Sequence, residues 1–141
     1  MKVTAKCDYA CKALLELAFH WPQEMPLQIH YISEKQKIPE RYLVQILIQL
    51  KGRGLVASSR GQHGGYLLAK SPKEISLGQI VRMMTGESLV SLAESVELEK
   101  TIFTDIWAEV ERAISKILDL ATFDDIRNKF YSKEKAIFYQ I

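Results

Sequence analysis

The feature that most constrains this chain is residues 38–70, IPERYLVQILIQLKGRGLVASSRGQHGGYLLAK. In its first part Pro39 suits the first position of a helix, and Gly52 and Gly54 lie where that helix should stop. Between them apolar residues recur every three or four positions, which predicts one buried face made of Tyr42, Leu43, Ile46, Leu47 and Leu50. The stretch therefore predicts an amphipathic helix that ends abruptly before a segment of different period.

The second part of this stretch predicts a β-hairpin. The segments LVASS and YLLA are short and β-prone, and the turn RGQHGG between them is rich in glycine. A shorter helix is expected just before residue 38, within LQIHYISEKQKI, with Ile29 and Ile32 turned inward. Two helices joined by a short turn and followed by a hairpin make a winged helix-turn-helix.

Helices are predicted for most of the remaining chain. One runs from Cys7 to Phe19 with Thr4 as its cap, and another follows Ser76 and closes at Gly86. A long apolar stripe from about Leu98 to Ala121 predicts a long helix, and a short helix and an aromatic tail follow it. We therefore expect a mainly α fold with three parts: a winged helix-turn-helix at 1–86, a connecting loop at 87–97, and a long dimerisation helix with a helical tail at 98–141.

The glycines of the turn favour a DNA phosphate over a nucleotide phosphate. A dinucleotide loop needs a strand, then G-x-G-x-x-G, then a helix, whereas these glycines are spaced G-x-x-G-G between two strands. A hairpin after a helix-turn-helix can follow a DNA backbone or enter a minor groove. Arg60 suits the negative potential of a narrow minor groove, His63 suits backbone or sugar, and Gly64 allows close approach to a phosphate.

On the proposed recognition helix, four side chains point away from the apolar face: Glu40, Arg41, Val44 and Gln45. Glutamine suits adenine, arginine suits guanine or phosphate, and valine suits a thymine methyl group. Lys51 and Arg53, at the end of the helix, suit the charge of the DNA backbone. The alternative for each of these residues is an ordinary solvated surface position.

Charge and composition narrow the class of protein. Residues 1–85 hold 12 Lys and Arg against 6 Asp and Glu, whereas residues 86–141 hold 7 against 11, so the front half should bind anions. The sequence has no long apolar run and no signal peptide, which predicts a cytoplasmic protein without a membrane span. We find no catalytic set and no metal-ligand spacing, and we therefore expect neither an enzyme nor a metal site.

The order of these motifs resembles the bacterial Rrf-type winged-helix transcriptional regulators, closely over residues 1–86 and in pattern through the long helix. That family includes an iron–sulfur cluster regulator, a nitric-oxide-sensing repressor and a cysteine-metabolism repressor. The resemblance implies a homodimeric repressor that binds inverted-repeat DNA, with Arg41, Gln45 and Arg60 at the contact. A glutamate is common in the family where this chain has Val44, so the base preference here is expected to differ.

Many members of the family hold an iron–sulfur cluster with three cysteines in the loop before the long helix. Residues 87–99 of this chain contain no cysteine, and Asp8, which matches an extra ligand position in some members, cannot hold a cluster alone. The sequence therefore indicates the cluster-free branch, without a cofactor. Cys7 and Cys11, four residues apart on one helix face, could act as a thiol sensor or as a site for a soft metal. The alternative is that they are two small, partly buried side chains without such a role.

The long apolar stripe is broader than a small domain needs, which favours burial against a second subunit. The dimer interface is expected to include Ile106, Trp107, Val110, Ile114 and Ile117. An alternative use of its aromatic residues is an effector pocket walled by Phe103, Trp107, Phe138 and Tyr139. The identity of any small-molecule or protein effector is open. The main rival function is a winged-helix module that binds a protein and has lost DNA binding.

Overall fold

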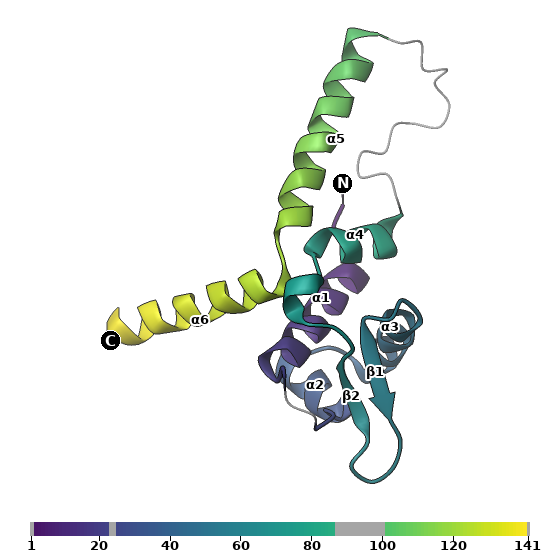
Figure 1. Ribbon diagram of the computed structural model, residues 1–141, viewed down its shortest axis with the longest axis vertical. Coiled ribbons are helices and arrows are strands. Elements are labelled where there is room, and N and C mark those ends of the chain that lie inside the picture. Colours follow the sequence, from purple (N-terminus) through teal and green to yellow (C-terminus); the bar gives the residue numbers. More distant parts are fainter. Residues whose placement is uncertain (1, 23–24, 87–100, 141) are drawn as a thin grey trace.

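The computed structural model describes residues 2–22, 25–86 and 101–140, and it is mainly helical with one two-stranded sheet (Figure 1). The expected fold class is confirmed. The elements follow in the order α1 (Ala5–Phe19), α2 (Ile29–Gln36), α3 (Glu40–Gly52), β1 (Val56–Ser59), β2 (Gly65–Leu68), the 3-10 helix η1 (Pro72–Glu74), α4 (Leu77–Thr85), α5 (Ile102–Leu120) and α6 (Phe123–Gln140).

Helix α1 is the centre of the core. Thr4 caps it as expected, because its hydroxyl accepts the N–H of Cys7 at 3.2 Å. Alanines at 10, 13 and 18 are fully buried between the larger side chains of Leu14 and Leu17. Small residues let neighbouring backbones approach closely, and α2, α3, α4 and α6 all pack against this one helix.

Helices α2 and α3 form the predicted helix-turn-helix. Helix α2 ends at Lys37, whose φ of 54° is left-handed, and Ile38 then enters the core. Pro39 is the residue before α3 rather than its first residue, since its carbonyl accepts the N–H groups of Tyr42 and Leu43. Gly54, with φ of 74°, follows the end of the helix as expected.

The wing is an antiparallel hairpin in which Val56 faces Leu68 and Ser59 faces Gly65. A third segment joins it, because Leu27 and Tyr66 exchange backbone hydrogen bonds of 2.8 Å in both directions. Gly65 has φ of 156°, and a β-carbon there would collide with the carbonyl group of Leu27. The hairpin is therefore attached to the segment that leads into α2.

The chain returns to the core where α5 meets α6. The N–H of Leu77 donates to the carbonyl of Ala121 at 2.7 Å, and the N–H of Phe123 donates to the carbonyl of Ile75 at 2.9 Å. Phe123 is buried in the main core, whereas most of α5 extends away from it. Arg82 of α4 and Asp119 of α5 form a bidentate ion pair of 2.5 and 3.1 Å that braces the start of this extension.

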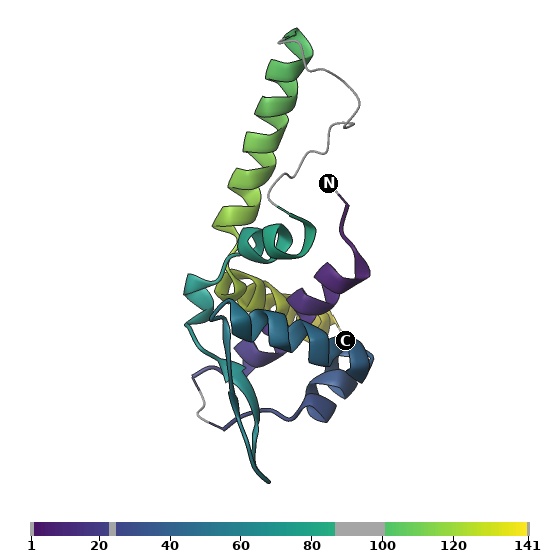
Figure 2. The same cartoon turned by 90° about the vertical axis from the view of Figure 1, so that its right-hand side faces the viewer.

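The two helices of the back half differ in extent from the prediction. Helix α5 begins at Ile102 rather than near Leu98, because Thr101 is extended and accepts the N–H of Thr104. Helix α6 is long rather than short, and residues 123–140 contain neither glycine nor proline to stop it. Thr122 and Asp125 cap the start of α6 through two reciprocal hydrogen bonds. Figure 2 shows α5 rising from the body while α6 leaves in another direction.

No helix in the described ranges is long and apolar enough to cross a membrane. The loop that was expected at residues 87–97, with its missing cysteines, lies outside the described residues.

Candidate nucleic-acid interface

The exposed face of α3 presents polar side chains, as the helical period predicts. Leu43, Ile46, Leu47 and Leu50 are buried against α1. On the opposite face Arg41 and Gln45 are exposed, and Val44 is half-buried beside them. A helix of 13 residues with this division can lie in a DNA major groove with its outer side chains toward the base edges.

Tyr42 does not belong to the buried face of α3, which corrects the predicted apolar stripe. Its side chain is 48% exposed, because it lies at the edge of the stripe, about 90° around the helix from the stripe's centre. The guanidinium carbon of Arg41 lies 4.9 Å from the centre of the Tyr42 ring, and its Nη2 donates to the tyrosine hydroxyl at 3.3 Å. Tyr42 therefore holds Arg41 at the surface.

Lys51 connects the end of α3 to the wing. Its Nζ donates to the hydroxyl of Ser58 on β1 at 2.6 Å. An ammonium group has three donors, so two remain for a phosphate in addition to this bond. Arg53, the residue at the C-terminal end of α3, is fully exposed. The two positive charges thus lie at the junction between the predicted recognition helix and the hairpin.

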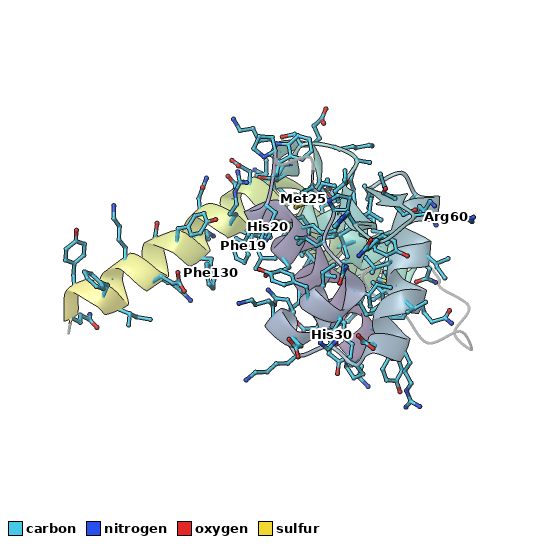
Figure 3. The ribbon with its side chains drawn as sticks, turned by 90° about the horizontal axis from the view of Figure 1, so that it is seen from below. Phe19, His20, Met25, His30, Arg60 and Phe130 are labelled. Atoms are coloured by element: carbon cyan, nitrogen blue, oxygen red, sulfur yellow. The ribbon has the colours of Figure 1, made fainter. Side chains whose placement is uncertain are left out.

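Arg60 directly follows β1 and points outward at the edge of the molecule, where Figure 3 labels it. Its side chain has no hydrogen bond to another described residue. His63, also exposed, lies in the same turn. The carbonyl of Gln62 accepts a bond of 3.4 Å from the side chain of Gln28, which supports the turn from α2. The turn therefore presents a free guanidinium on a braced hairpin.

The structure explains Gly64 by the shape of the turn itself. A β-carbon at Gly64 would collide with the backbone of Ser59 and Arg60, and its N–H donates to the carbonyl of Gly61 at 3.0 Å. Gly61 has φ of 109° with open space around it. Both glycines are thus required by the hairpin, whether or not a phosphate approaches Gly64.

The exposed carboxylate of Glu40 is already in contact with another side chain of the protein. Its Oε1 lies 3.1 Å from Nδ1 of His30, and the other ring nitrogen of His30 lies 3.2 Å from Glu34. His30 thus joins α2 to the first turn of α3. The carboxylate of Glu40 consequently serves the helix-turn-helix junction, which limits its freedom to accept a bond from a cytosine.

Ile48 was missed by the sequence interpretation. It is 57% exposed, although isoleucine is usually buried, and it follows Val44 by four positions and Gln45 by three. This spacing puts it on the same outer face of α3. The available signal was that the apolar residues of α3 are too many for one buried face.

The predicted dimer residues lie on α5, where only Leu118 is fully buried. Ile114 is half-buried against a small cluster of Cys7, Val81 and Leu118. The other four predicted residues are exposed in the single chain: Ile106, Trp107, Val110 and Ile117. These four side chains form an apolar face that no other described residue of the chain buries, which is the kind of surface that interaction sites use.

The aromatic side chains once considered for an effector pocket do not form one in this chain. Phe103 and Trp107 lie in the early turns of α5, whereas Phe138 and Tyr139 lie at the distal end of α6, and the two ends point apart (Figure 1). A shallow hollow at the end of α6 is lined by α6 residues alone. Phe130 instead packs on Phe19 of α1, with ring centres 4.9 Å apart.

Both cysteines of α1 are free thiols. Burial raises the pKa of Cys11 to about 12, with a further contribution from Cys7 and Asp8, and burial also raises the pKa of Cys7. The thiolate is the reactive form, so both groups are poor nucleophiles and poor ligands near neutral pH. The described residues contain no group of three or more His, Cys, Asp or Glu side chains arranged to hold a metal ion. This donor set does not fit an iron–sulfur cluster, which uses several thiolates.

Comparisons with known proteins agree with this architecture. A family model described as Rrf2, iron-dependent transcriptional regulator, matches residues 3–129. The transcriptional regulator CymR of Bacillus subtilis is 30% identical over 141 residues, which is 100% of both chains. The transcriptional regulator IscR of Pectobacterium carotovorum is 34% identical over 132 residues, or 91% of this chain and 80% of the relative.

The solved structure of CymR, described as the global cysteine regulator of B. subtilis, matches with a TM-score of 0.81 at 31% identity. The match covers 92% of this chain and 98% of that one. These relatives are transcriptional regulators rather than enzymes. The winged helix, the exposed face of α3 and these matches together show that the chain belongs to the Rrf2 family of DNA-binding transcriptional regulators.

Proposed function

We propose that this protein is a homodimeric repressor that binds an inverted-repeat DNA operator through α3 and the wing and contains no iron–sulfur cluster. The observation that carries this proposal is the pairing of the outer face of α3 with the free guanidinium of Arg60. Both are exposed, and Lys51 ties the two elements together by its 2.6 Å bond to Ser58. Such an arrangement supports simultaneous contact with a major groove and a neighbouring minor groove.

Within the major groove, Arg41 and Gln45 are the proposed readers of base edges. The amide of Gln45 matches adenine, and the guanidinium of Arg41, held by Tyr42, matches guanine. Val44 and Ile48 supply the apolar contacts to thymine methyl groups, with Ile48 the more exposed of the two. Glu40 contributes chiefly through His30, at the start of the helix.

The positive charges around this helix and the wing would supply the part of DNA binding that does not depend on base sequence. Lys51, Arg53 and His63 are the proposed phosphate and sugar contacts, and the backbone at Gly64 lies next to the same phosphates. Two copies joined through α5 present two equivalent recognition helices. The operator is therefore an inverted repeat with half-sites about 10 bp apart, or a multiple of one helical turn.

The proposed absence of an iron–sulfur cluster rests on the number of cysteines and on the state of their thiols. The whole chain has two cysteines, both on α1, and their raised pKa values oppose ligation. Protein purified without oxygen should be colourless and contain no stoichiometric iron or sulfide. Visible absorption with iron and sulfide at stoichiometric levels would contradict this part alone.

The decisive experiment selects bound fragments from genomic DNA with the purified protein and then measures affinity as a function of salt. Arg60→Ala should weaken operator binding by about 1–3 kcal/mol, the scale of one good groove contact, without unfolding the protein. Arg112→Ala on the polar side of α5 removes the same charge far from the wing and serves as the control. Failure to bind any DNA at low salt would favour the protein-interaction alternative.

A further inference from the structure

A hollow of about 470 Å³ opens between the start of α1 and one flank of α3, and its lining includes the proposed DNA contact Gln45. Small-molecule sites in proteins commonly have volumes of about 300–1,000 Å³. Its lining combines aromatic, aliphatic and polar side chains from both helices: Ala5, Lys6, Tyr9, Tyr42, Gln45 and Ile46. Three of these, Tyr42, Gln45 and Ile46, belong to the proposed recognition helix α3.

The aromatic lining suits a flat ligand. The rings of Tyr9 and Tyr42 lie 6.4 Å apart between centres with 34° between their planes, which makes a tilted aromatic wall. The guanidinium group of Arg41 also contacts the Tyr42 ring and its hydroxyl. Ile46 and Ala5 add aliphatic surface between the two helices. A planar ring gains stacking and apolar burial here, which an elongated aliphatic chain would gain only in part.

The polar lining suits a negative charge. The ammonium group of Lys6 and the amide of Gln45 have no hydrogen-bond partner among the described residues. The nearby carboxylate of Asp8 is already paired with Lys12 at 2.8 Å. In the first turn of α1 the cap Thr4 accepts the N–H of Cys7, so the N–H groups of Ala5 and Lys6 are left without a helical acceptor. The mouth of the hollow therefore carries uncompensated donors.

We propose that this hollow binds a planar aromatic carboxylate, and that binding there prevents α3 from engaging DNA. The carboxylate would accept from Lys6 and the Gln45 amide, and the ring would stack on Tyr9 and Tyr42. The exclusion would follow because a carboxylate bonded to the Gln45 amide adds a negative charge beside the face of α3 that DNA would approach, and the DNA phosphates carry the same charge. This regulatory half depends on the proposed function, whereas the binding half does not.

The binding half is tested without DNA by titrating the ¹⁵N-labelled protein with naphthalene-2-carboxylate. Amide shifts should concentrate in residues 5–9 and 42–46, and the Gln45 side-chain amide should shift with them. The matched neutral probe, naphthalene-2-carboxamide, should bind about tenfold more weakly, since it lacks the charge that Lys6 recognises. Shifts confined to the exposed apolar faces of α5 and α6, or no shifts at all, would overturn the proposal.

Two variants sharpen the assignment. Lys6→Gln, at an exposed position, should lower the affinity for the carboxylate about tenfold and leave that for the carboxamide unchanged. Lys2→Gln removes the same charge outside the hollow and should change neither affinity. Equal losses in both variants would mean that only net charge attracts the probe, which would refute a built site.

The regulatory half is tested by adding the carboxylate to the protein–operator complex. With trace operator and protein held below the operator's dissociation constant, half-maximal release should occur near the concentration that half-saturates the amide shifts. Lys6→Gln should raise that concentration about tenfold. Saturated shifts with undiminished operator binding would overturn the regulatory half. A protein that shows these shifts but binds no DNA would refute the proposed function and leave the ligand site intact.

Discussion

The front and back of this chain carry similar apolar patterns, yet they bury them very differently. Of the twenty apolar residues that are buried in the described part of the chain, only Leu118 and Phe123 lie within residues 101–140. Of the seventeen large apolar residues that are exposed in the same described ranges, twelve lie there. The spacing of apolar residues thus predicts an apolar helix face in both regions. It does not predict whether that face packs against the same chain or against another molecule.

The strongest test of this contrast is a charge placed on the exposed stripe of α5. Val110 is 37% exposed in the single chain, so Val110→Glu should leave the front-half core folded. In a dimer the same change buries an unpaired carboxylate in both subunits, and each burial costs several kcal/mol. Light scattering should therefore report a monomer, and specific DNA binding should fall far more than non-specific binding.

Lys116→Glu, which places the same acidic side chain at an exposed polar position of the same helix, is the control and should stay dimeric. A wild-type protein that is monomeric at micromolar concentration and still binds its operator tightly would refute the dimer proposal.

The second test compares one leucine of the core with one isoleucine of the stripe. Leu14 is fully buried in α1, so Leu14→Ala should lower the free energy of unfolding by about 2–5 kcal/mol. Ile117 is 71% exposed, so Ile117→Ala should barely change the unfolding of a monomeric background such as Val110→Glu. Chemical denaturation measures both. A loss for Ile117→Ala as large as that for Leu14→Ala would mean that α5 is covered within its own chain.

The smallest effect is expected at the two cysteines. Burial raises the pKa of Cys11 from an ordinary 9.0 to about 12, so the unfolded chain ionises first as pH rises. The stability that this thiol contributes is present in full below about pH 9 and is lost progressively toward pH 12. Near neutral pH the native Cys11 thiol should alkylate about 100-fold or more slowly than the same thiol in the denatured chain.

The variant carrying Cys7→Ser and Cys11→Ser should bind DNA nearly as well as the wild type, with or without peroxide. If the wild type responded to peroxide and this variant did not, the cysteines would be sensors after all.

The structure of residues 1–86 was largely predictable because the sequence patterns that set it are local. Ser76 and Gln79 form a capping box, Gly86 closes α4, and the glycines of the wing turn satisfy steric needs within a few residues. The exposed positions of Arg41, Gln45 and Arg60 follow from the same short-range periods. Tyr42 was predicted wrongly because a residue at the edge of an apolar stripe can turn either way, and its neighbours Tyr9 and Arg41 decided the outcome.

The sequence alone therefore determined where most helices begin and end, where the hairpin turns, and which face of each helix is apolar. These depend on backbone hydrogen bonds and sterics within one or two turns. Only the tertiary structure decided that Leu27 pairs with Tyr66, that Phe123 returns to Ile75, and that α5 and α6 diverge. Such contacts join residues far apart in the chain, and they depend on which apolar faces meet when several are available.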